Sequence, residues 1–311
     1  MPLTTRHLLF AAICLIWGTT WAATKLGVEA VPPMLFAGTR FLAAGALLLV
    51  WHWALRHRRG EVVLVRDLPR LAVSAVFLIP LTYAPLYWAL RIVPSGLAAV
   101  LNSALTPLMM LLLAILGREE RFAPRQGTAI AAGILGLVLL FRPGPPAAGG
   151  TDPLEGLGIA AVVAATFASC AGSVLTRPLL VRYPTVLLSA LTYLAGGAML
   201  LLVSLAFEPG ARAAAAGAWG LSAWFGWLYI VIFGTLIGYT FYFILLRDWG
   251  PSRAATYAFV CPVIAVVVGI FAFAESVSAS EVVGIALMLT AAALALGVRP
   301  PVPRLRAARE R

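Results

Sequence analysis

Ten apolar runs, each long enough to cross a lipid bilayer as a helix, account for most of this 311-residue chain. Of its residues, 62% are hydrophobic and 11% are charged, whereas a soluble domain is about 25% charged. A water-soluble fold could not hide so much apolar surface, but in lipid a helix satisfies its own backbone hydrogen bonds. We predict an all-α integral membrane protein with spans at 8–28, 34–53, 71–90, 95–116, 125–141, 156–176, 186–207, 222–246, 253–273 and 280–298.

The arginines indicate the orientation of these spans. With ten spans and a cytoplasmic N-terminus, 18 of the 22 arginines fall in cytoplasmic segments, and only Arg91, Arg142 and Arg212 fall on the outer side. Cytoplasmic loops of membrane proteins carry such an excess of Arg and Lys. The split predicts that both termini are cytoplasmic, and it assigns the +11 formal charge to membrane orientation, not to nucleic-acid binding.

The chain divides into two similar halves at 142–155, where Pro and Gly cannot continue a helix. In each half a Tyr precedes a Pro by 20 residues, and a Glu follows that Pro by 13 residues. At an offset of 152, the small residues 43–46 also align with 195–198. We predict a first repeat at 1–141, a linker at 142–155, a second repeat at 156–298 and a basic tail at 299–311.

Five is an odd number of spans, so the second repeat must insert upside down relative to the first. Inverted repeats are a recurring architecture of secondary transporters, whose substrate site lies near the midplane where the repeats meet. The sequence therefore predicts a transporter that works by alternating access.

The residues that end each half also carry a family resemblance. They are Pro107 and Glu120 followed by Gly133 and Gly136, and Pro262 and Glu275 followed by Gly284; the first span adds 17–21 (WGTTW) and the second adds 40–41 (RF). This pattern resembles two EamA domains of the drug/metabolite transporter superfamily. The resemblance implies a cavity lined by spans 1, 3, 4, 6, 8 and 9, with spans 5 and 10 peripheral. The Trp and Tyr residues make the chain similar to YddG-type exporters of aromatic amino acids.

Tyrosines on two predicted cavity helices are the first candidates for substrate binding. Tyr83 and Tyr87 share one face of span 3, and Tyr239 and Tyr242 share one face of span 8. Aromatic rings can stack on a planar substrate while their hydroxyls contact its polar groups. The alternative is a Tyr anchored at the membrane interface, which applies best to Tyr87.

Two further candidates occupy matched positions of the two halves, Asn102 in span 4 and Tyr257 in span 9. A buried amide needs a polar partner, because an unsatisfied polar group in hydrocarbon is costly. Asn102 could therefore bind substrate or bond to a neighbouring helix. Pro107 and Pro262 each remove a backbone donor, and we expect them to kink their helices and shape the cavity.

The first span supplies Trp17 and Trp21, which lie on one helix face. Either could stack on substrate or fill the core. The corresponding positions of the second half are Ser169 and Ser173, so one wall of the cavity would carry rings and the other hydroxyls.

Only two cations fall inside the spans and not at a span end, Lys25 and Arg40. Each could extend its side chain to the membrane interface, or it could meet the carboxylate of an amino-acid substrate. All 12 acidic residues lie in loops or at span ends. We therefore predict transport that is not coupled to protons through a membrane-embedded acid.

We predict an exporter of small metabolites, with aromatic or hydrophobic amino acids as the leading class and drugs or other metabolites as the rival. The three His and three Cys lack ligand or nucleophile spacing, so we expect no metal, cofactor, disulfide or enzymatic activity. A membrane enzyme acting on lipid-linked substrates and a sensory or structural subunit are the weaker alternatives. The expected partners are a small-molecule substrate and the bilayer of a bacterial inner membrane; a monomer is compatible with the sequence.

Overall fold

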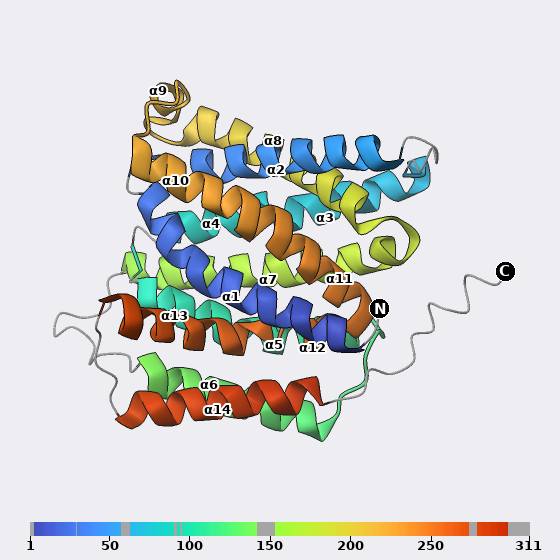
Figure 1. Cartoon of the computed structure of the whole chain (residues 1–311), viewed down its shortest axis with the longest axis vertical. Helices are drawn as coiled ribbons and strands as arrows, with labels where there is room; N and C mark the ends of the chain where they lie inside the picture. Colours follow the sequence, from blue (N-terminus) through green and yellow to red (C-terminus); the bar gives the residue numbers. More distant parts are fainter. Residues whose placement is uncertain are drawn as a thin grey trace. The chain divides into compact units, whose positions relative to one another are not determined.

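The computed structural model describes residues 3–28, 30–56, 63–89, 92–93, 95–141, 153–273 and 279–297. Every regular element within these ranges is a helix (Figure 1). In chain order they are α1 (Leu3–Val28), α2 (Pro33–Arg56), the 3₁₀ turn η1 (Val65–Asp67), α3 (Leu68–Leu78), α4 (Pro80–Ala89), α5 (Ser95–Leu116), α6 (Pro124–Phe141), α7 (Pro153–Arg182), α8 (Thr185–Phe207), α9 (Ala211–Ala214), α10 (Leu221–Tyr229), the π-helix η2 (Ile230–Tyr239), α11 (Thr240–Trp249), α12 (Pro251–Ala254), α13 (Tyr257–Phe273) and α14 (Ala279–Leu296).

Each predicted span falls on one of these helices or on a short succession of them. The predicted span 71–90 is divided between α3 and α4, because Pro80 follows the turn at Ile79. By length and apolar composition, five described ranges can cross a membrane: Pro33–Ala54, Val65–Ala89, Gly156–Arg182, Thr185–Phe207 and Leu221–Trp249. Shorter apolar helices cover Leu101–Leu116 and Val282–Leu296. The all-helical membrane fold is confirmed, while the count of ten crossings and their orientation remain predictions.

The chain forms two compact units, which are described separately below. Unit 1 comprises Met1–Ala84 and Ala171–Asp248, and unit 2 comprises Pro85–Cys170 and Trp249–Arg311. Each unit takes sequence from both predicted repeats, so the units in space differ from the repeats along the chain. The linear boundaries of the repeats remain a prediction.

In unit 1, α2 packs along α8, its counterpart in the second half (Figure 1, blue and yellow). A methyl group on Gly38 would lie 2.9 Å from the backbone nitrogen of Leu201, and one on Gly197 would lie 2.9 Å from the backbone nitrogen of Leu42. Glycine therefore lets the two backbones approach closely, as in other helix pairs within membranes. Gly45 and Gly197, one from each of the aligned small-residue segments, both lie at this helix contact.

In unit 2, α6 packs along α14, again a helix with its counterpart (Figure 1, green and red). A methyl group on Gly136 would lie 2.8 Å from the carbonyl oxygen of Gly284 on α14. The ring of Phe259 on α13 occupies the space beside Gly133. The glycines of the family pattern therefore have a packing role here.

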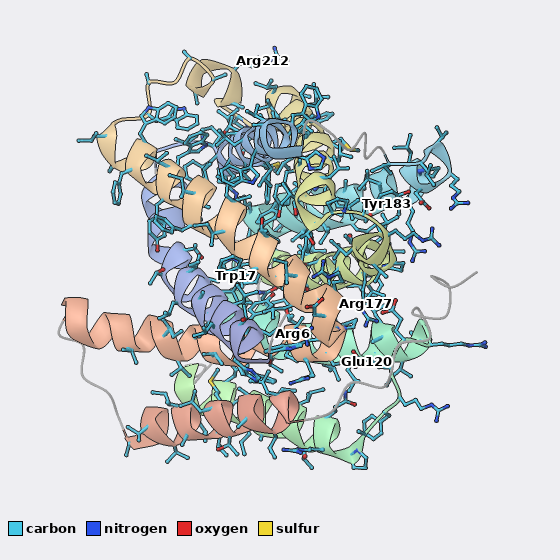
Figure 2. The ribbon with its side chains drawn as sticks, turned by 45° about the vertical axis from the view of Figure 1, so that its right-hand side comes forward. Arg6, Trp17, Glu120, Arg177, Tyr183 and Arg212 are labelled. Carbon is cyan, nitrogen blue, oxygen red and sulfur yellow. The ribbon has the colours of Figure 1, made fainter. Side chains whose placement is uncertain are left out.

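The helices of unit 1 are also tied together where α11 ends (Figure 2). Arg6 near the start of α1 forms an ion pair with Asp248, with 3.0 Å between Nε and Oδ2. Arg177 near the end of α7 is buried, and its Nε donates to the carbonyl oxygen of Leu246 at 3.2 Å. Both arginines are among those that the distribution of charge predicts to be cytoplasmic.

Candidate functional site

Seven aromatic side chains of unit 1 form one group, which we call the aromatic cluster. Their ring centroids lie between 5.1 and 6.4 Å from those of their neighbours in the group, within the range of favourable aromatic pairs. The cluster draws on helices that are distant in sequence. Its members are Trp17 (α1), Phe41 (α2), Tyr83 (α4), Tyr193 (α8), Tyr239 (η2), and Tyr242 and Phe243 (α11).

Two predicted site residues meet directly in the cluster. The hydroxyl oxygens of Tyr83 and Tyr239 lie 2.6 Å apart, so one hydroxyl donates a hydrogen bond to the other. Either atom could be the donor. A hydroxyl pair of this kind can exchange its mutual bond for bonds to a polar ligand.

Arg40 adds a positive charge to this group. Its side chain is buried, with 6% of the residue exposed, and its guanidinium carbon lies 4.7 Å from the ring centroid of Phe41 and 4.8 Å from that of Tyr83. Cations over aromatic ring faces are attracted by the ring quadrupole. The guanidinium of Arg40 therefore contacts aromatic rings of α2 and α4, and its two predicted roles both remain open.

Tyr242 and Ser173 form a second polar contact at the cluster. The Tyr242 hydroxyl donates to Oγ of Ser173 on α7 at 3.0 Å, and both residues are buried. The prediction placed rings on one wall and serine hydroxyls on the other; here one ring and one serine bond to each other. Together with Arg40 and Ser173, the cluster therefore brings ring faces, hydroxyls and a guanidinium close together.

Trp17 contacts two tyrosines of the second half, Tyr239 and Tyr242. Its ring centroid lies 5.1 Å from that of Tyr239 and 5.5 Å from that of Tyr242. Its indole Nε1 donates to the carbonyl oxygen of Gly234 on η2 at 3.1 Å. In Figure 2 Trp17 lies on α1 where that helix runs beside the α10–η2–α11 run.

Four predicted site residues belong to unit 2 and not to the aromatic cluster. Tyr87 on α4 is buried, while Asn102 on α5, Ser169 on α7 and Tyr257 on α13 are partly buried. Oδ1 of Asn102 accepts a hydrogen bond from Oγ1 of Thr166 on α7 at 3.0 Å. The helix–helix bond considered for this amide is therefore present.

Four further predicted residues remain: two prolines inside helices and two side chains on α1. Pro107 lies inside α5 and Pro262 inside α13, and both helices continue past the proline. Trp21 and Lys25 lie on α1, but their side chains are outside the described residues.

Tyr193 was not among the predicted site residues, yet its ring belongs to the aromatic cluster. Tyr193 is almost fully buried, and its ring centroid lies 5.7 Å from that of Phe41 and 5.9 Å from that of Tyr239. It follows Phe41 by 152 residues, the same offset that aligns the small residues of the two halves. Extending that alignment by a few positions could have found it.

A buried carboxylate lies elsewhere in unit 1, at the end of α8. Glu208 accepts hydrogen bonds from the backbone N–H groups of Met34 and Leu35, each at 3.0 Å, and from the Ser204 hydroxyl at 2.6 Å. It thereby caps the N-terminus of α2, where unpaired N–H groups and the helix dipole favour a negative charge. Across the residues that the structure describes, no three His, Cys, Asp or Glu side chains are grouped to hold a metal ion.

This chain is similar to several bacterial proteins and to a solved structure. The uncharacterized inner membrane transporter YedA of Escherichia coli K12 is 29% identical over 284 residues, covering 91% of this chain and 88% of that one. Protein PecM of Dickeya dadantii is 28% identical over 294 residues, covering 91% and 89%. The uncharacterized transporter YvbV of Bacillus subtilis is 25% identical over 294 residues, covering 94% and 92%. A crystal structure with 24% identity superimposes with a TM-score of 0.76 over 99% of both chains, which shows a shared fold.

The profile of the EamA-like transporter family matches this chain twice, at residues 5–142 and 156–297. Together the two matches cover most of the chain, so the EamA-like domain is present twice. This protein is therefore a membrane transporter that belongs to the EamA-like transporter family.

Proposed function

We propose that this transporter exports small amphipathic metabolites, and that amino acids with aromatic or hydrophobic side chains are its substrates. The aromatic cluster would be the substrate site, with Tyr83, Tyr239 and Tyr242 providing ring faces and hydroxyls. Arg40 would bind the carboxylate of the substrate.

The observation that carries this proposal is the position of Arg40. Its guanidinium lies over the rings of Phe41 and Tyr83, and the Tyr83 hydroxyl is bonded to that of Tyr239. A carboxylate, a ring and a polar group on one small molecule therefore have complementary partners within one cluster. Such a substrate would exchange the Tyr83–Tyr239 hydrogen bond for bonds of its own.

The proposed setting is the bacterial inner membrane, with both termini in the cytoplasm. The supporting observations are the excess of arginines on one side of the predicted spans and the similarity to an inner membrane transporter. Inverted repeats would allow the site to open to either side in turn. The acidic residues in loops and at span ends favour movement down the substrate gradient, without proton coupling.

A direct test measures the export of radiolabelled amino acids from cells that overproduce the protein. Phenylalanine, tyrosine, tryptophan and leucine should leave these cells several times faster than cells carrying the Arg40→Gln variant. Glutamate and lysine serve as charged controls and should leave both at equal rates. The amino-acid proposal would be rejected if every amino acid left both kinds of cell at equal rates. Export of compounds from a drug panel would then favour the rival proposal, an exporter of drugs or other metabolites.

The coupling proposal has its own test in proteoliposomes. Uptake of the exported amino acid should stop at equal concentrations on both sides, with or without an imposed pH gradient. Accumulation that depends strictly on the pH gradient would contradict uncoupled transport.

A further inference from the structure

An unusual helix form adjoins the aromatic cluster. The helical run from Leu221 to Trp249 contains the ten-residue π-helix η2, Ile230–Tyr239, between two α-helical stretches. In a π-helix each N–H bonds to the carbonyl five residues earlier; such segments are rare and often lie at functional sites. The sequence of η2 is purely apolar apart from Thr235 and Tyr239, so its own residues give no reason for this form.

The indole of Trp17 lies against η2 at two glycines. Nε1 of Trp17 donates to the carbonyl oxygen of Gly234 at 3.1 Å. A methyl group on Gly238 would lie 2.5 Å from the same Nε1 and 3.2 Å from Cδ1, so only glycine leaves room for the ring. Trp17 therefore bonds to a π-helix carbonyl through a gap that Gly238 provides.

The form of η2 decides where the tyrosines of the cluster point. Tyr239 is the last residue of η2, and Tyr242 follows it in α11. If η2 took the α-helical form, its hydrogen bonds would shift by one residue, which turns the following segment by about 100° around the helix axis. Such a turn would move the Tyr239 hydroxyl away from Tyr83, which now lies 2.6 Å from it.

We propose that Trp17 is a positioning residue that holds η2 in its π-helical form, and that release of its bond to Gly234 lets the segment turn and opens the aromatic cluster. Trp17 then acts on the substrate site through the backbone of η2, and not by stacking on substrate. The last step, opening for transport, rests on the proposed function; the hold of Trp17 on η2 does not.

The hold can be measured without any substrate, by hydrogen–deuterium exchange of the detergent-purified protein. Trp17→Phe keeps an aromatic ring but removes the indole donor. Amide exchange in 230–239 should rise about fivefold, while exchange in the α8 segment 187–200 stays the same. Unchanged exchange in 230–239 would overturn the proposal.

Trp224→Phe is the matched control. Nε1 of Trp224 also donates to a glycine carbonyl at 3.1 Å, that of Gly217, but this bond does not involve η2. The control should leave exchange in 230–239 unchanged. An equal rise in the control would mean that η2 responds to any loosening of unit 1, which contradicts a specific role for Trp17.

A second variant guards against a folding defect in the first. Gly238→Ala places a methyl group against Nε1 of Trp17 and should raise exchange in 230–239 to a similar degree. Because both changes disrupt one contact, the double variant should exchange within twofold of either single variant. Multiplied effects would mean two independent contacts, and the proposal would fail.

Export kinetics separate positioning from substrate contact. For an exported aromatic amino acid, Trp17→Phe and Gly238→Ala should lower the maximal rate severalfold while KM stays within twofold. A tenfold rise in KM for Trp17→Phe at an unchanged maximal rate would show that the indole touches substrate, which would overturn the positioning role. If no amino acid is exported, the proposed function fails, but the exchange result still decides whether Trp17 holds η2.

Discussion

Tyr83 and Tyr239 are 156 positions apart in the chain, yet their hydroxyl oxygens lie 2.6 Å from each other. One residue comes from each half of the protein, on α4 and at the end of η2. The bond joins two hydroxyl groups within the aromatic cluster, and each of these groups could instead bond to a polar ligand. The hydroxyl pair is thus both a packing contact and the most direct candidate for a substrate contact.

Removing one hydroxyl of this pair should have a modest effect on stability. Interhelical hydrogen bonds within membranes contribute about 0.6 kcal/mol on average, with a maximum of about 1.7 kcal/mol. Tyr83→Phe and Tyr239→Phe should each destabilise the protein by about that amount in detergent unfolding. The double variant should lose less stability than the sum of the two single variants, because both single changes remove the same hydrogen bond. Fully additive costs would show that each hydroxyl depends on other partners.

Arg40→Gln tests recognition of the carboxylate. If the guanidinium binds this group, the variant should lose most of its export of phenylalanine. Export of phenethylamine, which has no carboxylate, should change little, so the ratio of the two export rates should fall. Arg212→Gln is the control, because Arg212 is exposed on α9 and lies outside the cluster (Figure 2). A uniform loss for both compounds would assign Arg40 a structural role over the rings.

Glycine substitutions should distinguish close helix contacts from open positions. Gly197→Ala would place a methyl group 2.9 Å from the backbone nitrogen of Leu42 and should destabilise the protein by about 1–3 kcal/mol. Gly156→Ala on α7 meets no atom within 4 Å and should be neutral or stabilise by up to about 1 kcal/mol. Unfolding in increasing SDS measures both. Equal stability of the two variants would mean that α2 and α8 can separate without cost.

Glu208→Ala should destabilise the N-terminal end of α2. The change removes the acceptor of two backbone N–H groups and should cost about 1–2 kcal/mol, as the loss of other helix caps does. Ser204→Ala removes one donor to the same carboxylate and should cost less. Hydrogen exchange at Met34 and Leu35 provides the local measurement. Unchanged exchange there in Glu208→Ala would show that the cap is dispensable.

Asn102 can be assigned to structure or to substrate by comparison with its partner. Thr166→Val removes the donor to Oδ1 of Asn102 and keeps the shape of the side chain. If Asn102 serves helix packing, Asn102→Ala and Thr166→Val should lower stability alike and leave the KM for export unchanged. A raised KM in Asn102→Ala alone would return Asn102 to the substrate site.

Only some of the predicted site residues lie in the aromatic cluster. Residue spacing shows which residues share a helix face, but it does not show which helix packs against that face. Tyr239 and Tyr242 were placed on one face of a span, and both reach the aromatic cluster. Tyr87 shares a predicted face with Tyr83, yet it falls in the other compact unit. Tyr193 gave no local signal because its role depends on the crossing of α2 and α8, which brings it to Phe41.

The sequence alone determined the class of this protein. Apolar runs of spanning length predict an all-helical membrane protein, and the repeated Pro–Glu spacing carries the resemblance to two EamA domains. The helical form follows from the lipid environment, which requires each spanning segment to pair its own backbone groups. This form is therefore visible in the local pattern of residues and does not depend on how the helices pack.

Only the tertiary structure decided which polar groups meet. Three contacts each join helices that are distant in sequence: the bond of Tyr83 to Tyr239, the position of Arg40 over the ring of Tyr83, and the bond of Trp17 to the carbonyl oxygen of Gly234. The π-helical form of η2 in particular could not be predicted, because its apolar residues are equally compatible with an α-helix. The helix that packs against η2 is known only once the chain has folded.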